Sequence, residues 1–152
     1  SFTEIMLNQG RVPSSKVLAY LIVRPSKSEK DKLKLSDDEM ILRMERIRFA
    51  DDVPICYEVA SIPERLIRPF SKEEIAASLY ATLEEKGGYQ IGAANQTITA
   101  ILASEQVADY LAVKKGEAIL RMRQISFFDD GTPFEYVRSQ YVGSRFEFYL
   151  EK

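Results

Sequence analysis

The chain has 152 residues, of which 45% are apolar and 29% charged, and its net charge is -2. These values are typical of one globular domain, and the lack of a basic excess argues against nucleic-acid binding by this segment. The chain has no histidine and one cysteine, which excludes Ser-His-Asp and Cys-His catalysis, zinc sites that use histidine, and an internal disulfide. No apolar run is long enough to span a bilayer, so we expect no membrane segment.

The chain opens with signals for a helix, a strand and a second helix. Residues 1–10 predict a short helix capped by Ser1 or Thr3 and closed by a glycine. Val17–Arg24 is rich in Val, Leu and Ile, as strands are, and a proline follows it. A short acidic and lysine-bearing helix is then expected through about Leu33.

Ile41–Ile62 predicts a β-hairpin with Asp51–Val53 as a three-residue loop. The expected cross-strand pairs are Ala50 with Pro54, Arg48 with Cys56, and Arg46 with Glu58. Side chains alternate across a strand, so one face carries the apolar set expected to form the core: Ile47, Phe49, Ile55, Tyr57 and Val59. The other face carries Arg46, Arg48 and Glu58.

The two arginines of this hairpin are the sharpest chemical feature of the sequence. Residues two apart on one strand face have Cα atoms roughly 6.5–7 Å apart, so two guanidinium groups converge on one small anion. The alternative is a solvent-exposed strand face, on which Arg46 and Glu58 form an ordinary cross-strand ion pair.

The second half of the chain repeats the first. The tetrapeptide ILRM occurs at 41–44 and again 78 positions later at 119–122, each time followed by an aromatic residue and Asp-Asp. The same offset carries the strand Val17–Arg24 onto Asn95–Leu102, and an inserted Gly131 shifts the later matches by one. Each half therefore reads as strand, helix, strand, strand, and duplication is the better interpretation.

Two further elements complete the expected fold. Ser71 and Glu74 form a capping box at the start of a helix predicted to run to Lys86, where two glycines end it. The alternation in Arg145–Leu150 predicts one more strand. About six strands joined mostly by tight hairpins, with helices to the side, imply an α+β domain on an antiparallel sheet.

The two halves differ in their polar residues. Gln124 and Ser126 stand where the first half has its arginine pair, whereas Glu135 and Tyr141 share one face of the last predicted hairpin strand. A two-ended pocket is one interpretation, with the cations taking an anion and the carboxylates taking hydroxyl or amine groups. Tyr141 as an ordinary core residue is the other.

Three segments together resemble a known family. They are SFTEIMLNQGRVPSSKVL near the start, the hairpin ERIRFADDVPICYEVASIP, and FFDDGTPFEYVRSQYVGSRFEF near the end. In this order they resemble the effector-binding (UTRA) domain of GntR/HutC-type bacterial transcription regulators. The resemblance implies one effector-binding domain over residues 1–152, with a chorismate-lyase-like fold. It also implies a homodimer, and an N-terminal winged helix-turn-helix domain that is absent from this sequence.

Within the family, the motifs are similar to those of regulators of amino-sugar use that respond to a phosphorylated sugar. The resemblance implies phosphate binding by Arg46 and Arg48, with help from Ser78, Tyr80, Phe2 and Thr3. It implies sugar binding by Glu58, Glu135 and Tyr141. Arg138 stands where those regulators carry lysine, and we expect it at the sugar end of the site.

We therefore expect a cytoplasmic, non-catalytic sensor that binds a phosphorylated sugar or amino sugar and controls operator DNA binding through the missing domain. Neither a cofactor nor a metal is expected. Two alternatives stay open: a regulator that senses a carboxylate metabolite, and a chorismate-lyase-like enzyme.

Overall fold

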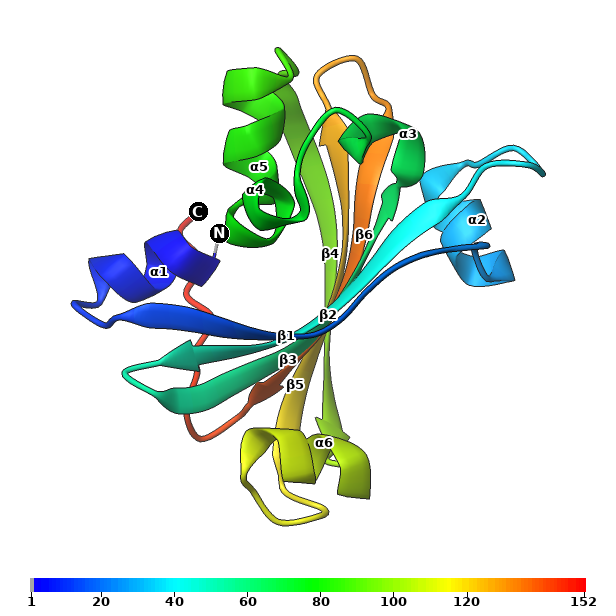
Figure 1. Ribbon diagram of the computed structural model, residues 1–152. Coiled ribbons are helices and arrows are strands. Elements are labelled where there is room, and N and C mark those ends of the chain that lie inside the picture. Colours follow the sequence, from blue (N-terminus) through cyan, green and yellow to red (C-terminus); the bar gives the residue numbers. More distant parts are fainter. Residues whose placement is uncertain (1) are drawn as a thin grey trace.

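A computed structural model describes residues 2–152, which form one six-stranded antiparallel sheet in the order β1-β2-β3-β6-β5-β4 (Figure 1). The strands are β1 (Pro13–Val23), β2 (Ile41–Ala50), β3 (Val53–Pro63), β4 (Ile91–Leu102), β5 (Ala118–Phe128) and β6 (Pro133–Val142). The helices are α1 (Phe2–Asn8), α2 (Lys27–Leu33), α3 (Glu64–Ile67), α4 (Lys72–Ala77), α5 (Leu79–Ala81), the π-helical turn η1 (Thr82–Lys86) and α6 (Glu105–Leu111). The predicted α+β class and six strands are confirmed. Within the described residues, no helix has the length and apolar content needed to cross a bilayer.

The internal duplication is visible in the topology. The first half runs β1-α2-β2-β3, the second runs β4-α6-β5-β6, and the halves meet where β3 pairs with β6 at the centre of the sheet. The helices α2 and α6 begin at serine caps, Ser26 and Ser104, and end at left-handed residues, Lys34 and Ala112. Both pairs are separated by the offset of the sequence repeat, so the duplication extends to the helix caps. Of the caps expected for the first helix, Ser1 lies outside the described residues, and Thr3 lies inside α1.

The turn of the β2–β3 hairpin is shorter than predicted. Asp51 and Asp52 both adopt left-handed backbone, with φ of 50° and 63°, so Ala50 pairs directly with Val53. A tertiary contact holds this two-residue turn, because the Asp51 carboxylate accepts a hydrogen bond of 2.9 Å from the Val12 amide. The predicted three-residue loop and the pair of Ala50 with Pro54 are therefore wrong.

A β-bulge beyond the turn restores the predicted register. Ile55 is the extra residue on β3, and from there Arg48 pairs with Cys56 and Arg46 with Glu58. Both predicted pairs are confirmed. The bulge thus compensates for the shorter turn, and both arginines stay on one side of β2.

Helices cover both faces of the sheet. The face that carries the two arginines packs against α3, α4, α5 and η1 through Leu42, Ile62, Ile75 and Leu83, which are all nearly or fully buried. The opposite face packs against α6, where Leu111 contacts a cluster that includes Ile47 and Val142. The predicted core face of Ile47 is therefore confirmed, and the face of the two arginines forms a second core surface that the pattern did not predict.

The helix predicted over residues 71–86 is interrupted at Ser78. Its capping box, formed by Ser71 and Glu74, is confirmed, but Ser78 has extended backbone (φ −163°, ψ 105°) and divides α4 from α5. The Ser78 hydroxyl accepts a hydrogen bond from the Ala81 amide at 3.2 Å and so caps the second segment. A serine side chain can replace a backbone hydrogen-bond partner in this way, which lowers the free-energy cost of interrupting the helix.

The C-terminal segment is not the strand that its alternation predicted. The guanidinium group of Arg145 donates to the main-chain carbonyls of Pro54, Leu111 and Ala112 at 2.8–3.2 Å. The ring of Phe146 packs on Tyr141, with 4.4 Å between centroids. These contacts fix the segment against the end of α6 and beside α1 (Figure 1).

Candidate functional site

Arg46, Arg48 and Glu58 form a buried ionic cluster, which we call the arginine site. The arginines lie on β2 and the glutamate on β3, and their exposed fractions are 8%, 9% and 7%. Such low exposure is rare for charged side chains. The alternative of a solvent-exposed strand face is therefore wrong.

One carboxylate serves both guanidinium groups in the arginine site. Arg46 Nη2 donates to Glu58 Oε1, and Arg48 Nη1 lies 3.6 Å from Glu58 Oε2. Burial opposes ionisation of Glu58, but the two arginines outweigh it and hold the pKa of Glu58 below its ordinary value. The cluster therefore carries one positive charge more than its own carboxylate balances.

Several arginine donors in the site have weak partners or none. Arg46 Nη1 donates to the carbonyl of Ala76 at 3.1 Å, close to the point where Ser78 interrupts the helix. The Nε atoms of Arg46 and Arg48 are buried and have no hydrogen-bond partner among residues 2–152. Buried donors of this kind are seldom left unpaired, so the site has capacity for another acceptor.

The first helix closes the arginine site on one side. The ring of Phe2 lies 4.7 Å from Arg48 Cζ, and Thr3 Oγ1 accepts from Arg48 Nη2 at 3.4 Å. Phe2 also belongs to an apolar cluster with the buried Tyr141 and Phe146. Contacts from α1 therefore depend on the side chain of Arg48.

A second polar cluster lies on the same face and joins Tyr80 of α5 to β5 and β6. The Tyr80 hydroxyl donates to Glu135 Oε1 at 2.9 Å and lies 2.6 Å from Ser126 Oγ. Burial, and then the charge of Glu58, raise the pKa of Glu135 to about 7. Gln124 Nε2 donates to Ser126 Oγ at 2.9 Å. Glu58 pairs with Ser139 on β6, an even number of residues from Glu135, so the two clusters share one face of the sheet.

The structure gathers eight of the ten predicted site residues around these clusters: Phe2, Thr3, Arg46, Arg48, Glu58, Tyr80, Glu135 and Tyr141. Ser78 lies at the helix interruption, two residues after the carbonyl that contacts Arg46. Its side chain is exposed and caps α5.

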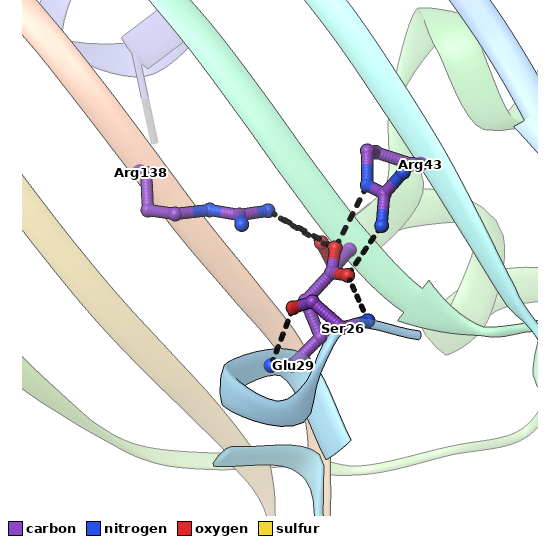
Figure 2. A network of polar contacts seen from close by, with 5 residues as sticks. Ser26, Glu29, Arg43 and Arg138 are labelled. Carbon is purple, nitrogen blue, oxygen red and sulfur yellow. Dashed lines mark hydrogen bonds and ion pairs between the residues drawn. The ribbon is translucent and has the colours of Figure 1, made fainter. Parts of the chain in front are cut away.

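Arg138 lies on the opposite face of the sheet, and its expected place in the site is wrong. It belongs to what we call the Glu29 network, formed by Ser26, Glu29, Arg43, Ser61 and Arg138 (Figure 2). Strand alternation explains the separation, because Arg138 is an odd number of residues from both Glu135 and Tyr141 on β6.

Glu29 is the centre of this network. It is fully buried and accepts from Arg43 through both carboxylate oxygens, from the Ser61 hydroxyl and from the Ser26 amide. Burial opposes ionisation, but the bonds from Arg43 and Ser61 outweigh it and lower the pKa of Glu29 to about 2. The network attaches α2 to β2, β3 and β6 and has a structural role.

Sequence reasoning missed three groups at the site. The Ala76 carbonyl reaches Arg46 only because the helix is interrupted, and nothing in the local sequence signalled that contact. Gln124 and Ser126 were recognised as the counterparts of the arginine pair but not as part of the site. Their equivalence under the repeat offset was the signal that could have placed them there.

Fold and site define an α+β ligand-binding domain with a buried cation pair. The model of the UTRA domain family matches residues 8–147, so the chain belongs to the UTRA domain family. A GntR-family transcriptional regulator from Enterococcus faecalis V583 is 61% identical, and its crystal structure has a TM-score of 0.89, covering 91% of this chain and all of that one. The predicted chorismate-lyase-like fold is confirmed with it.

Two other relatives extend the comparison. The HTH-type transcriptional repressor NagR of Bacillus subtilis is 28% identical over 148 residues, which are 97% of this chain and 61% of NagR. The chain thus spans about three fifths of that repressor's length. The effector domain of PhnF from Mycobacterium smegmatis, 24% identical, has the same fold with a TM-score of 0.88, covering 98% of this chain and 92% of that domain.

Proposed function

We propose that this domain binds a phosphorylated sugar or amino sugar at the arginine site and thereby controls DNA binding by a transcription regulator. The observation that carries the proposal is the burial of two guanidinium groups beside a single carboxylate. A phosphate dianion supplies the missing negative charge, and its oxygens suit the planar donor arrays of arginine. Ser78, at the helix interruption beside Arg46, is the further phosphate ligand.

The sugar end of the ligand lies toward the second half. Glu58 and Glu135 are acceptors for hydroxyl or amine hydrogens, and the Tyr80 hydroxyl lies beside them. Tyr141 supplies an apolar wall for the ring, since it is buried among aromatic side chains. The sequence resemblance to regulators of amino-sugar use supports the same orientation.

Ligand binding changes the elements that close the site. An anion between the arginines competes with Thr3 for Arg48 and with the Ala76 carbonyl for Arg46. Both α1 and α4 then move relative to the sheet, and α1 carries the change toward an N-terminal DNA-binding domain of the kind implied by the family. A coupling of ~1–3 kcal/mol is enough for such control. As a DNA-binding regulator, the protein acts in the cytoplasm.

The regulator is a homodimer that uses β4. This edge strand is exposed along Gly92–Ile98, and residues 87–104 contain no charged side chain. A long uncharged edge pairs readily with another strand, and antiparallel pairing with its own copy satisfies two-fold symmetry. Light scattering should show a dimer for the unmodified protein and a monomer for Thr97→Lys. Ser14→Lys, on the exposed edge strand β1, is the matched control and should remain dimeric.

Calorimetry with hexose 6-phosphates tests the arginine site. Arg46→Ala or Arg48→Ala should weaken binding by ~2 kcal/mol or more, because each removes charge-assisted hydrogen bonds, while circular dichroism shows an intact fold. Arg123→Ala removes an exposed strand arginine and should leave the affinity unchanged. Unchanged affinity in both site variants would remove the phosphate proposal.

The two alternatives make different predictions in the same assays. A regulator that senses a carboxylate metabolite is stabilised thermally by organic acids but not by sugar phosphates. An enzyme converts chorismate or a sugar phosphate, which chromatography of the incubated mixture detects. The relatives described above are named as transcription regulators, which supports the non-catalytic function.

A further inference from the structure

The Glu29 network has an incomplete counterpart in the second half of the sheet. The repeat offset carries Arg43 onto Arg121, so the arginine of the network is kept. The same offset carries Glu29 onto Val107, the third residue after the serine cap of α6. The second half therefore has the cation of this network without its carboxylate.

The strand register agrees with this equivalence. Arg43 pairs with Ser61 across β2 and β3, and Arg121 pairs with Gln140 across β5 and β6. Ser61 and Gln140 are separated by the repeat offset of the later matches, which includes the inserted glycine. Arg43 and Arg121 therefore occupy equivalent places in the two halves of the sheet.

The guanidinium group of Arg121 lacks the partner that Arg43 has. Arg43 donates from Nε and Nη2 to the two carboxylate oxygens of Glu29. The side chain of Arg121 forms no hydrogen bond or ion pair with any of residues 2–152, although its Nε is buried. A buried guanidinium donor is seldom left unpaired, so Arg121 has capacity for an acceptor from outside the domain.

Arg123 adds a second cation to the same face of the sheet. It is exposed, lies two residues from Arg121 on β5, and likewise has no side-chain partner within the part of the chain that the structure describes. On the next strand it pairs with Arg138, which already contacts Glu29. Like charges directly opposite each other are unfavourable, so this face carries uncompensated positive charge.

We propose that Arg121 and Arg123 form a docking site for an acidic, carboxylate-bearing segment of a partner protein. A carboxylate bound to Arg121 reproduces the two-point contact that Glu29 makes with Arg43. The docking site does not depend on the proposed function, because its register with Arg138 places it on the face opposite the arginine site.

The surroundings of the two arginines favour an acidic protein segment over other anions. Arg123 and its neighbour Thr97 on β4 are exposed, so the docking site is an open strand surface, whereas small-molecule sites are concave. The net charge of -2 and the exposed carboxylates of Glu105 and Asp109 on α6 oppose a nucleic-acid backbone. Arginine is also enriched in protein interfaces, where charge complementarity selects the partner.

Fluorescence anisotropy with a labelled oligoglutamate peptide tests the docking site on the unmodified protein. The peptide should bind, and an oligoglutamine peptide of equal length should not. Arg121→Met and Arg123→Met should each weaken binding about three- to tenfold, because each removes a charge-assisted contact. Arg68→Met removes an exposed arginine at the end of α3 and should leave peptide binding unchanged.

Val107→Glu tests the same site from within the chain. It supplies a carboxylate at the position equivalent to Glu29, and its pairing with Arg121 should reduce peptide binding to the level of Arg121→Met. Circular dichroism checks the fold of each variant. Absence of peptide binding to the unmodified protein overturns the proposal, and so does unchanged binding in both arginine variants, whether or not Val107→Glu folds. Tighter binding of citrate or of duplex DNA than of the peptide also overturns it, and assigns the two arginines to a small anion or to nucleic acid.

Discussion

Two buried ionic clusters lie on opposite faces of the same sheet and have the same composition, two guanidinium groups around one carboxylate. They differ in the burial of their cations. The side chains of Arg46 and Arg48 are 10% and 11% exposed, whereas those of Arg43 and Arg138 in the Glu29 network are 34% and 28% exposed.

This difference in burial separates the structural Glu29 network from the proposed ligand site. In the Glu29 network the carboxylate is saturated with hydrogen bonds, and water solvates the excess positive charge on the partly exposed arginines. In the arginine site the excess charge is shielded from water and the buried carboxyl of Glu135 is held toward its neutral form, so an anion that enters can supply the compensation. The two clusters therefore share their composition and differ in the burial of the surplus charge, on which the proposal of a ligand site at Arg46 and Arg48 rests.

The largest expected effect tests the structural side of the comparison. Glu29→Ala leaves the Arg43 guanidinium, the Ser61 hydroxyl and the Ser26 amide without their acceptor, so the free energy of unfolding should fall by ~3–5 kcal/mol. Urea denaturation measures the change. Glu39→Ala removes the carboxylate of a more exposed ion pair with Arg65 and should cost less than ~1 kcal/mol. Similar losses in both variants would contradict the assignment.

The two buried glutamates should make the free energy of unfolding depend on pH in opposite directions. Folding raises the pKa of Glu135 to about 7, so its proton stabilises the folded state below the ordinary carboxyl pKa, and that contribution is lost as pH rises toward 7. Glu29, with a pKa of about 2, contributes above its ordinary pKa and loses the contribution as pH falls toward 2.

Glu135→Gln tests the predicted loss of stability as the pH rises toward the pKa of Glu135. The variant should abolish the decline in stability between about pH 4.5 and 7, a difference of about 2–3 kcal/mol that denaturation at several pH values resolves. Parallel stability curves for the variant and the unmodified protein over this range would show that Glu135 does not titrate there.

Methionine substitutions of Arg48 and Arg43 should have different effects on the free energy of unfolding. Arg48→Met removes the surplus buried cation and leaves Arg46 paired with Glu58, so stability should stay equal or rise by ~1 kcal/mol. Arg43→Met breaks the two-point pair with Glu29 and should lower stability by ~2 kcal/mol. Thermal unfolding without ligand compares the two, and a larger loss for Arg48→Met would reverse the interpretation.

The smallest expected effect concerns the duplicated helix caps. Ser26→Ala removes one side of a capping box whose Glu29 is also the centre of the network, and should cost ~1 kcal/mol. Ser104→Ala removes the equivalent cap of α6, where Val107 replaces the glutamate, and should cost ~0.5–1 kcal/mol. Denaturation curves of both variants test whether the Glu29 network strengthens its cap.

The sequence predicted those parts of the site that depend on strand alternation. The two-residue spacing of Arg46 and Arg48 places both on one face whatever the length of the turn, and that placement is confirmed. The repeat offset similarly predicted the order of elements in the second half. Alternation also predicted Glu135 and Tyr141 on one face, whereas the place given to Arg138 followed the resemblance and is wrong.

The sequence did not predict that the side chains of Arg46, Arg48 and Glu58 are buried. The sequence pattern of an arginine pair on a strand does not depend on whether solvent or a helix covers the pair. The helices that cover Arg46 and Arg48 come from distant segments, residues 2–8 and 72–77. The sequence also did not predict the helix interruption at Ser78, because residues 71–86 have helical periodicity throughout.

Alternation, capping and the repeat thus determined the six strands of the sheet, the pairing of Arg46 with Glu58 and the shared face of Arg46 and Arg48, because these depend on neighbours in the chain. Tertiary packing alone decided that the charges of Arg46, Arg48 and Glu58 lie away from water, because that depends on which distant segments cover them. Only that covering keeps the surplus charge away from water, which is the physical basis of the proposed ligand site.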